Sequence, residues 1–311
     1  MSAFTSEELA VPGLAVAPSR RPARRRWTGL LYVAPAMALV GVFFILPLGM
    51  TVWMSLHNWP LVGEHRFIGL ANYWAIGRDL RFWNALKFTA YYTVIVTVAI
   101  FAVAFPLALF VERPRPMVGL YRTAFFLPVV VGFASASLLW SWLLNVDAGL
   151  FSPAAERLGL TQGRFNLLAT FDPAFWSIIV MVVWKVAGFT MVIIMTGLQS
   201  VPADLHEAAR LDGAGAFARF RLITLPLIRR TLTLALILSV TGSVLAFDQF
   251  YIILRGGPRN GTITAVYWIF NQSFVSFKLG YGAALSVVLL AVLIVLSLIQ
   301  LVALRPPEGG R

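Results

Sequence analysis

The sequence contains no cysteine among its 311 residues, which excludes disulfide bonds and thiolate metal sites. Charged side chains are also scarce, because Asp, Glu, Lys and Arg together make up 12% of the chain, about half the share of a soluble domain. The three histidines, His57, His65 and His206, lie far apart and show no metal-ligand spacing. A soluble fold could not cover its surface with so few charges, so we exclude a soluble globular protein.

Hydrophobic residues, in contrast, make up 59% of the chain, and the mean hydropathy is +0.81. This composition excludes intrinsic disorder. We predict an all-α polytopic membrane protein, because every backbone polar group must be hydrogen-bonded within lipid. A transmembrane barrel would need short alternating segments, which the sequence lacks. The net charge of +12 is therefore interpreted by position along the chain, and we predict no nucleic-acid partner.

Six segments are long and apolar enough to span a membrane, which takes about 20 mostly apolar residues. They are Gly29–Met50, Phe88–Val111, Thr123–Leu144, Phe175–Leu198, Thr231–Leu254 and Tyr281–Leu304. We therefore predict three parts: a basic tail over residues 1–26, a six-helix domain embedded in membrane lipid over residues 27–304, and a second tail over residues 305–311.

The positions of Lys and Arg predict the orientation in the membrane. With both tails in the cytoplasm, 15 of the 25 Lys and Arg residues fall inside and nine outside, and Lys185 lies within a span. This bias predicts a multi-pass protein with both termini cytoplasmic. A cleaved signal peptide is disfavoured, because the first apolar run is too long and no small-residue cleavage site follows it.

The segment between the fourth and fifth spans, Gly197–Arg230, is too long for a simple turn and too polar to enter lipid. Pro202 suits the first turn of a helix, and Ser200 is a candidate cap just before it. Gly213 and Gly215 permit a sharp reversal, after which apolar residues recur at helical spacing. We predict a helix, a glycine turn and a second helix beneath the membrane.

The spacing within this segment resembles a known family. Glu207-Ala208-Ala209, then Gly213 after three residues, then Ile223-x-Leu225-Pro226 after nine more, resembles the EAA loop of binding-protein-dependent ABC importer permeases. The sequence GLQSVP before the loop and Phe67–Tyr73 after the first span resemble the sugar and glycerol-3-phosphate branch, whose first permease subunit is of the maltose type. Phe247-Asp248 followed by Gly256-Gly257-Pro258 is similar to the fifth-span ending of that branch.

The resemblance extends from about Trp27 to Leu304 and implies the transmembrane domain of a type I ABC importer. It also implies a location in the bacterial cytoplasmic (inner) membrane. It implies that the loop over residues 199–230 couples this chain to an ATPase. The coupling residues would be Glu207, Ala208, Ala209, Arg210, Asp212, Gly213, Ile223, Leu225 and Pro226.

The same resemblance implies the partners of the chain: a second homologous permease, two ATPase subunits and an extracytoplasmic solute-binding protein. The sequence has no GxxxxGK[ST] phosphate-binding loop, so it cannot hydrolyse ATP unaided. We therefore predict no cofactor in this chain and no catalysis by it alone. ATP and Mg²⁺ would bind the partner ATPases.

A solute path through the spans should combine polar and aromatic side chains, because sugars combine hydroxyls with apolar ring faces. The fifth span carries a small and polar stripe at helical spacing, Ser239, Gly242, Ser243, Ala246 and Gln249, for which close helix packing is the alternative. The pathway candidates are Ser137, Trp140, Trp184, Lys185, Thr190, Ser243, Asp248 and Gln249.

Lys185 and Asp248 are the charged residues within the predicted spans, where such groups usually face a cavity or a partner. Lys185 could hold an anionic solute or form a salt bridge to Asp248, and the resemblance favours a structural role. Asp248 could instead pair with Arg255 or cap the outer turn.

Two other classes of protein fit the sequence less well. An integral-membrane enzyme would need clustered acids, histidines or serines, which the spans lack. A secondary transporter driven by an ion gradient often has internal repeats and helices broken at the midplane, and the EAA loop has no role in it. The solute stays open among sugars, oligosaccharides, polyols and glycerophosphodiesters.

Overall fold

The computed structural model describes residues 24–159 and 163–303, and these form two compact units, Met1–Met50 and Thr51–Arg311. The first unit contains α1 (Arg24–Val40), η1 (Gly41–Ile45, a π-helical turn) and the start of α2 (Leu46–Ser55). Tyr32–Ser55 is long and apolar enough to cross a membrane, so the first predicted span is confirmed as an apolar helix that ends five residues later than expected.

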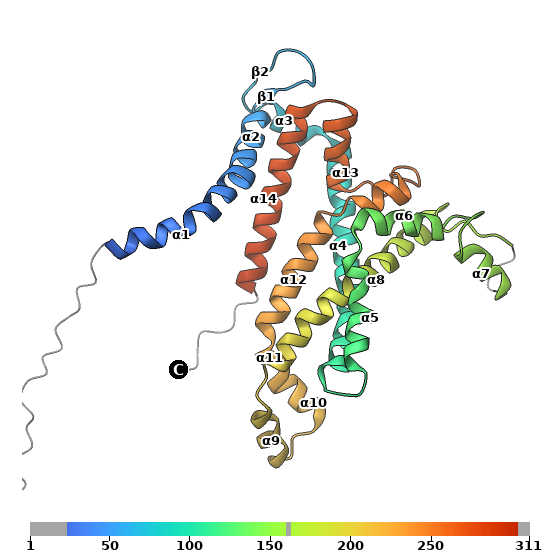
Figure 1. Ribbon diagram of the computed structural model, residues 1–311. Coiled ribbons are helices and arrows are strands. Elements are labelled where there is room, and N and C mark those ends of the chain that lie inside the picture. The colour runs from blue at the N-terminus through green and yellow to red at the C-terminus, as the bar shows by residue number, and fades with distance from the viewer. Residues whose placement is uncertain (1–23, 160–162, 304–311) are drawn as a thin grey trace, which may run out of the picture. The chain divides into compact units, whose positions relative to one another are not determined.

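The second unit is a helical bundle with one small hairpin. Strands β1 (His57–Asn58) and β2 (Arg66–Phe67) pair antiparallel, with His57 opposite Phe67. The helices are α3 (Ala71–Arg78), α4 (Leu80–Glu112), α5 (Val118–Val130), α6 (Phe133–Leu143), α7 (Phe151–Arg157), α8 (Phe171–Gln199), α9 (Ala203–Leu211), α10 (Ala216–Arg219), η2 (Phe220–Thr224), α11 (Leu225–Leu227), α12 (Arg229–Val244), η3 (Phe250–Leu254), α13 (Ala265–Phe270), η4 (Asn271–Val275) and α14 (Leu279–Ala303). Within this unit, β1, β2 and α3 lie at one end and α9 and α10 at the other (Figure 1).

Among the described residues, four helices are long and apolar enough to span a membrane, and the number rises to six if each of two bent helix pairs is one span. The third predicted span is such a pair, because α5 and α6 meet at 94°. The fifth predicted span also breaks, since α12 ends at Val244 and helix resumes only near η3. The predicted spans Thr123–Leu144 and Thr231–Leu254 are therefore helical but each is interrupted by a break.

The third span bends where Val131 and Gly132 adopt extended backbone. Pro128 lies within the last turn of α5, and glycine has low helix propensity, so the helix is locally weak here. Hydropathy alone could not reveal the bend, because Val131 and Gly132 are as apolar as their neighbours.

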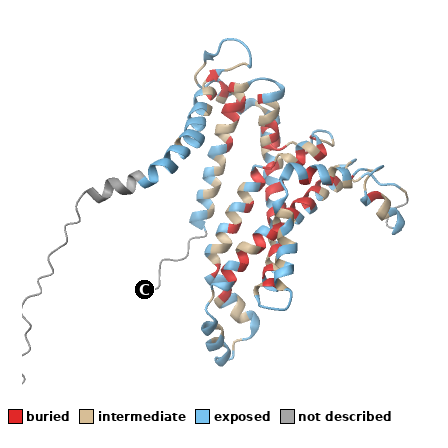
Figure 2. Cartoon of the chain, viewed as in Figure 1, coloured by how far each residue is buried: buried red, intermediate tan, exposed pale blue. Residues whose placement is uncertain are grey.

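Helices α4 and α8 form the centre of the second unit. In α8, 61% of the most apolar stretch is buried inside the chain, against 11% in α14, so α14 faces outward and α8 is enclosed (Figure 2). Gly188 allows α8 to approach α5 closely, because a Cβ at this position would overlap the backbone carbonyl of Phe125. Tyr92, Phe175 and Phe250 fill the core around these helices.

Asp79 joins three elements at the β1–β2 end. Its Oδ1 accepts hydrogen bonds from the backbone N–H groups of Arg81 and Phe82, which caps α4. Its Oδ2 accepts from Trp268 Nε1 of α13 at 3.0 Å and from the Tyr281 hydroxyl of α14 at 2.7 Å. Partial burial alone would raise the pKa of Asp79, but these four hydrogen bonds outweigh it and hold the pKa below its ordinary value of 3.8.

We expect Asp79→Ala to lower the free energy of unfolding of the assembled protein by about 2–4 kcal/mol, because it removes a helix cap and hydrogen bonds to a charged acceptor. The stability that this carboxylate adds is complete above pH 3.8 and is lost as the pH falls through its lower folded-state pKa. Thermal unfolding between pH 3 and 7 measures both effects. Asp79→Asn should lose this acid-dependent component, and an unchanged profile would contradict the assignment.

Candidate functional site

Lys185 lies opposite the bend between α5 and α6. The break leaves the last carbonyl groups of α5 without helical partners. The Lys185 ammonium donates hydrogen bonds to the carbonyls of Pro128 and Val129, both at 3.4 Å, and to that of Val131. It also lies 4.7 Å from the centre of the Phe133 ring. The buried cation therefore satisfies backbone groups that lipid could not hydrogen-bond.

The break after α12 is bridged by residues from distant parts of the chain. Thr264 donates its hydroxyl hydrogen to the freed carbonyl of Ala246 at 2.8 Å and accepts from the backbone of Tyr267, which caps α13. The Thr89 hydroxyl of α4 accepts a hydrogen bond from the backbone N–H of Ala265 at 2.9 Å. The residue before α13 thus satisfies one carbonyl that the break leaves free, and α4 holds the start of α13 in place.

The two breaks open onto one cavity of about 410 Å³. Its lining comes from α4, the α5–α6 bend, α8, α12 and the segment after α12, and comprises Tyr92, Ile100, Val129, Val130, Val131, Gly132, Phe133, Val182, Lys185, Val186, Phe189, Leu238, Ser239, Gly242, Ser243 and Gln249. Gln249 Nε2 donates to the Tyr92 hydroxyl at 3.2 Å across the cavity wall. Mostly apolar walls with a few converging polar groups are typical of a small-molecule site.

The structure separates the predicted pathway residues into two groups. Lys185, Ser243 and Gln249 line the cavity, together with Ser239 and Gly242 of the predicted stripe. The other five candidates lie outside its lining: Ser137, Trp140, Trp184, Thr190 and Asp248. Sequence analysis missed Tyr92, although a polar hydroxyl in an otherwise apolar span is a signal that could have found it.

The residues outside the lining have other surroundings. Ser137 is fully buried and donates to the Phe133 carbonyl of its own helix. The rings of Trp140 and Trp184 pack with their centres 5.8 Å apart. Thr190 is also buried, with 1% of its surface exposed. These contacts connect α6 and α8 within the bundle.

A salt bridge between Lys185 and Asp248 was one interpretation of the sequence, and a pair between Asp248 and Arg255 was another. In the part of the chain that the structure describes, the one ion pair joins Arg164 and Asp147 at 3.1 Å. Both predicted pairs are therefore wrong. Lys185 takes backbone carbonyls as partners because the α5–α6 bend places these closer than any carboxylate.

The segment between α8 and α12 forms the predicted helical hairpin. Helix α9 ends in a Schellman turn, in which the N–H of Gly213 bonds the Arg210 carbonyl and the N–H of Ala214 bonds the Ala209 carbonyl. Gly213 has a φ of +77°, in the left-handed region that favours glycine. Gly215 has a φ of −65°, so only Gly213 needs to be glycine for the reversal.

Ser200 does not cap α9 as predicted. Its hydroxyl donates to the Gly197 carbonyl, so it terminates α8, and α9 begins at Ala203 without a side-chain cap. Pro202 is itself the extended residue directly before α9, so it precedes the first turn of the helix. Asp204 lies in the first turn of α9, where a carboxylate favours the positive end of the helix dipole.

The hairpin presents an exposed apolar surface. Leu211 is 91% exposed, Phe217 74% and Leu222 72%. Exposed apolar groups of this size, grouped on one loop, mark an interaction surface. Glu207 and Arg210 also line a recess of about 410 Å³ beside the end of α4. Of the other predicted coupling residues, Ala208, Asp212, Leu225 and Pro226 are exposed, and Ala209 and Ile223 are partly buried.

Comparison with known proteins is consistent with this geometry. The family model described as "Binding-protein-dependent transport system inner membrane component" matches residues 67–305. The sn-glycerol-3-phosphate transport system permease protein UgpA of Escherichia coli O157:H7 is 34% identical over 291 residues, covering 91% of this chain and 96% of that protein. The probable starch degradation products transport system permease protein AmyD of Thermoanaerobacterium thermosulfurigenes is 30% identical over 270 residues, covering 87% and 91%.

A solved structure shares the fold. It is a bacterial alginate ABC transporter in complex with an alginate pentasaccharide-bound periplasmic protein, and it superimposes with a TM-score of 0.77. The match covers 93% of this chain and 98% of that chain, at 19% sequence identity. The bent spans and the hairpin are therefore placed within a fold known from ABC importers.

Proposed function

Because the chain belongs to the family of binding-protein-dependent transport system inner membrane components, we propose that it forms half of the pathway for a carbohydrate or related polar solute. It is a permease subunit of an ABC importer and not an enzyme by itself. The observation that carries the choice of solute is the cavity at the two helix breaks, where Ser243 and Gln249 add polar groups to mostly apolar walls. The named solutes of the relatives, starch degradation products and sn-glycerol-3-phosphate, are rich in hydroxyls and support this choice.

The pathway in this proposal is completed by a second, homologous permease. Polar groups in the cavity favour such a partner, because lipid offers them no hydrogen bonds. Two ATPase subunits bind ATP and Mg²⁺ and supply the energy. An extracytoplasmic binding protein delivers the solute, as the periplasmic protein in the alginate transporter complex suggests.

The hairpin α9–α10 is the contact to one ATPase. Its exposed apolar side chains and the charges of Glu207 and Arg210 form a surface that a second protein would cover. The bias of Lys and Arg toward the same side as the hairpin supports a cytoplasmic position for the hairpin and for both termini. Movement of the ATPases would then reach the bent spans through α8 and α12, which flank the hairpin.

The proposal is tested with the assembled complex in lipid nanodiscs. A thermal-shift screen of the cognate binding protein against sugars, oligosaccharides, polyols and glycerophosphodiesters identifies the solute. We expect the loaded binding protein to stimulate ATP hydrolysis by the complex. A complex that transports the solute without any ATPase, driven by an ion gradient alone, would overturn the proposal.

The cavity assignment makes a separate prediction. Gln249→Ala should lower solute transport about tenfold, because a buried polar partner lost from a binding site costs about 1–3 kcal/mol. Asp248→Asn changes the adjacent side chain outside the cavity and should transport at close to the wild-type rate. Uptake of labelled solute into proteoliposomes measures both. Loss of uptake in Asp248→Asn with normal uptake in Gln249→Ala would show that the solute passes on the side of Asp248 and not through this cavity.

A further inference from the structure

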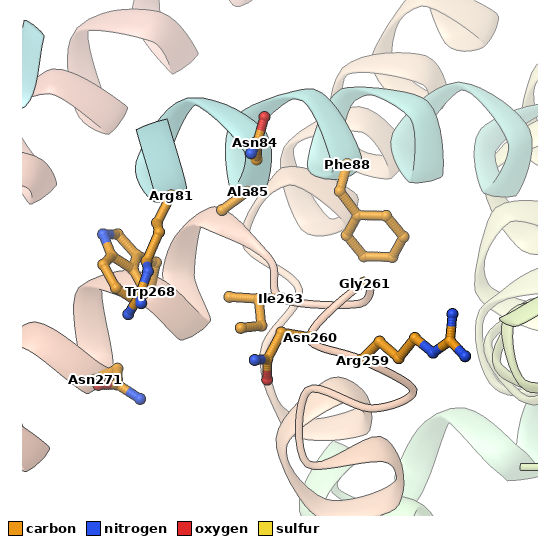
Figure 3. Close-up of a pocket in the computed structure, with 10 residues that line it drawn as sticks. All are labelled: Arg81, Asn84, Ala85, Phe88, Arg259, Asn260, Gly261, Ile263, Trp268 and Asn271. Atoms are coloured by element: carbon orange, nitrogen blue, oxygen red, sulfur yellow. The ribbon is translucent and has the colours of Figure 1, made fainter. Parts of the chain in front are cut away.

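A polar recess lies at the β1–β2 end of the second unit, between the first turns of α4, the loop over residues 255–264 and α13. Its volume is about 520 Å³. We call this hollow the cationic recess. Its polar lining consists of Arg81, Asn84, Arg259, Asn260, Trp268 and Asn271 (Figure 3). Two guanidinium groups and three amides thus line a hollow that contains no carboxylate.

A second recess of about 470 Å³ adjoins the first, because Arg81 and Trp268 line both, and it adds the ammonium group of Lys278. Asp79 lines this second recess, but its oxygens already accept four hydrogen bonds. Within residues 24–159 and 163–303, neither Arg81, Arg259 nor Lys278 forms an ion pair. Arg81 instead lies over the Trp268 ring, 5.8 Å from its centre. Arg81 and Arg259 therefore line the first recess, and Arg81 and Lys278 the second, without an ion-pair partner among the described residues.

The loop that carries Arg259 is held at several points. Gly257 donates to Leu254, Gly261 donates to Pro258, and Thr262 donates its hydroxyl hydrogen to the carbonyl of Gly257. Arg259 and Asn260 both have positive φ, +53° and +59°. Non-glycine residues adopt this region at a cost, and such strain concentrates at ligand contacts. The rim of the recess is preorganised rather than collapsed onto the surface.

A chain of aromatic contacts links the recess to the wall of the central cavity. Phe88 lines the recess, and its ring centre lies 5.4 Å from that of Phe250. Phe250 in turn lies 4.9 Å from Tyr92, which bonds Gln249 in the cavity. The recess and the cavity are therefore joined by the packed rings of Phe88, Phe250 and Tyr92.

We propose that the cationic recess receives an acidic surface loop of the extracytoplasmic binding protein. The inference rests on the proposed function and on its orientation, which places this end outside. The cations lie apart on the rim, and Figure 3 shows the guanidinium of Arg259 pointing away from Arg81 across the hollow. Separated cations match several carboxylates on a protein surface better than the single charge of one small solute.

The test uses the assembled complex and the purified binding protein loaded with solute. The double variant Arg81→Glu/Arg259→Glu should need about tenfold more binding protein for half-maximal stimulation of ATP hydrolysis at about 50 mM salt. The difference should shrink at about 300 mM salt, because exposed charges are screened. Arg157→Glu reverses an exposed arginine on the other predicted outer segment and should behave as wild type.

Co-purification of the ATPases reports assembly. Arg81→Gln/Arg259→Gln gives a milder variant in which about a threefold shift is expected. Suppose that both double variants need the same amount of binding protein as the wild type for half-maximal stimulation, and that the wild type is stimulated normally. This result overturns docking at the recess but not the proposed function. If the amount of binding protein for half-maximal stimulation is unchanged but less solute is carried per ATP, the recess contacts the solute and the docking proposal is overturned. A wild-type complex that the binding protein does not stimulate overturns both.

Discussion

Gly213→Val and Glu207→Lys are each expected to abolish solute-stimulated ATP hydrolysis while the permease still inserts into the membrane. Gly213 closes the Schellman turn of α9 with a φ of +77°, and a β-branched residue is strongly disfavoured there. A Cβ at Gly213 meets no atom of this chain within 4 Å. The effect would therefore come from the strained turn, which would present the surface proposed for the ATPase in another geometry.

Glu207→Lys acts through charge. Glu207 is exposed on α9 and lines the recess that also contains Arg113 and Arg210. Loss of one charged contact at a buried interface costs about 2–5 kcal/mol, and each 1.4 kcal/mol is about tenfold in affinity. We therefore expect the ATPase to dissociate from the Glu207→Lys complex at the concentrations used for purification.

Gly215→Val is the matched control for the turn. Gly215 has a φ of −65°, which any residue adopts, and a Cβ there also meets nothing within 4 Å. Pull-down of the ATPase from detergent-solubilised membranes and solute-stimulated ATP hydrolysis measure the outcome. If Gly213→Val and Glu207→Lys both retain the ATPase and its stimulation at the level of Gly215→Val, the hairpin is not the coupling element.

Lys185→Met is expected to reduce the yield of assembled complex severely. The change removes the donor that satisfies the carbonyls of Pro128, Val129 and Val131 at the α5–α6 bend. Lys185 is 4% exposed, so water cannot replace it without entering the bundle. Each buried carbonyl left without a partner costs about 1–3 kcal/mol, and the loss of several gives an effect of about 3–5 kcal/mol.

The same variant distinguishes the structural role of Lys185 from a role in holding an anionic solute. A structural role lowers the melting temperature and the amount of complex recovered by size-exclusion chromatography. A solute-binding role would leave both unchanged and abolish transport. Lys185→Arg keeps hydrogen-bond donors at this position and should recover part of the yield, whereas equal yields for the Met variant and the wild type would refute the structural role of Lys185.

The helical hairpin between α8 and α12 is the feature that sequence reasoning described best. The turn depends on residues within five positions of each other, Ala209 to Ala214, so its chemistry is visible in a short stretch. The glycine that needs positive φ was identified together with Gly215, which does not. Ser200 was misplaced because a serine before Pro202 suits both the end of one helix and the start of the next, and only the observed hydrogen bond to Gly197 distinguishes them.

The bends in the third and fifth spans were not predicted. Hydropathy reports whether a segment prefers lipid, and it is unchanged when that segment breaks in the middle. A break is tolerated only if other groups take up the freed backbone hydrogen bonds. Those groups are Lys185 for the third span and Thr264 for the fifth, and neither lies in the segment it stabilises.

The sequence by itself determined the class of protein, the approximate positions of its apolar helices, the hairpin and the family, because each depends on composition or on spacing within about twenty residues. Tertiary structure alone decided the cavity. In its wall Gln249 bonds Tyr92, which is 157 positions away in the sequence. The α5–α6 bend beside it is held by the bond from Lys185 to Val131, which is 54 positions away. Such contacts depend on how whole helices pack against each other, and the local preferences of either residue contain no information about the other.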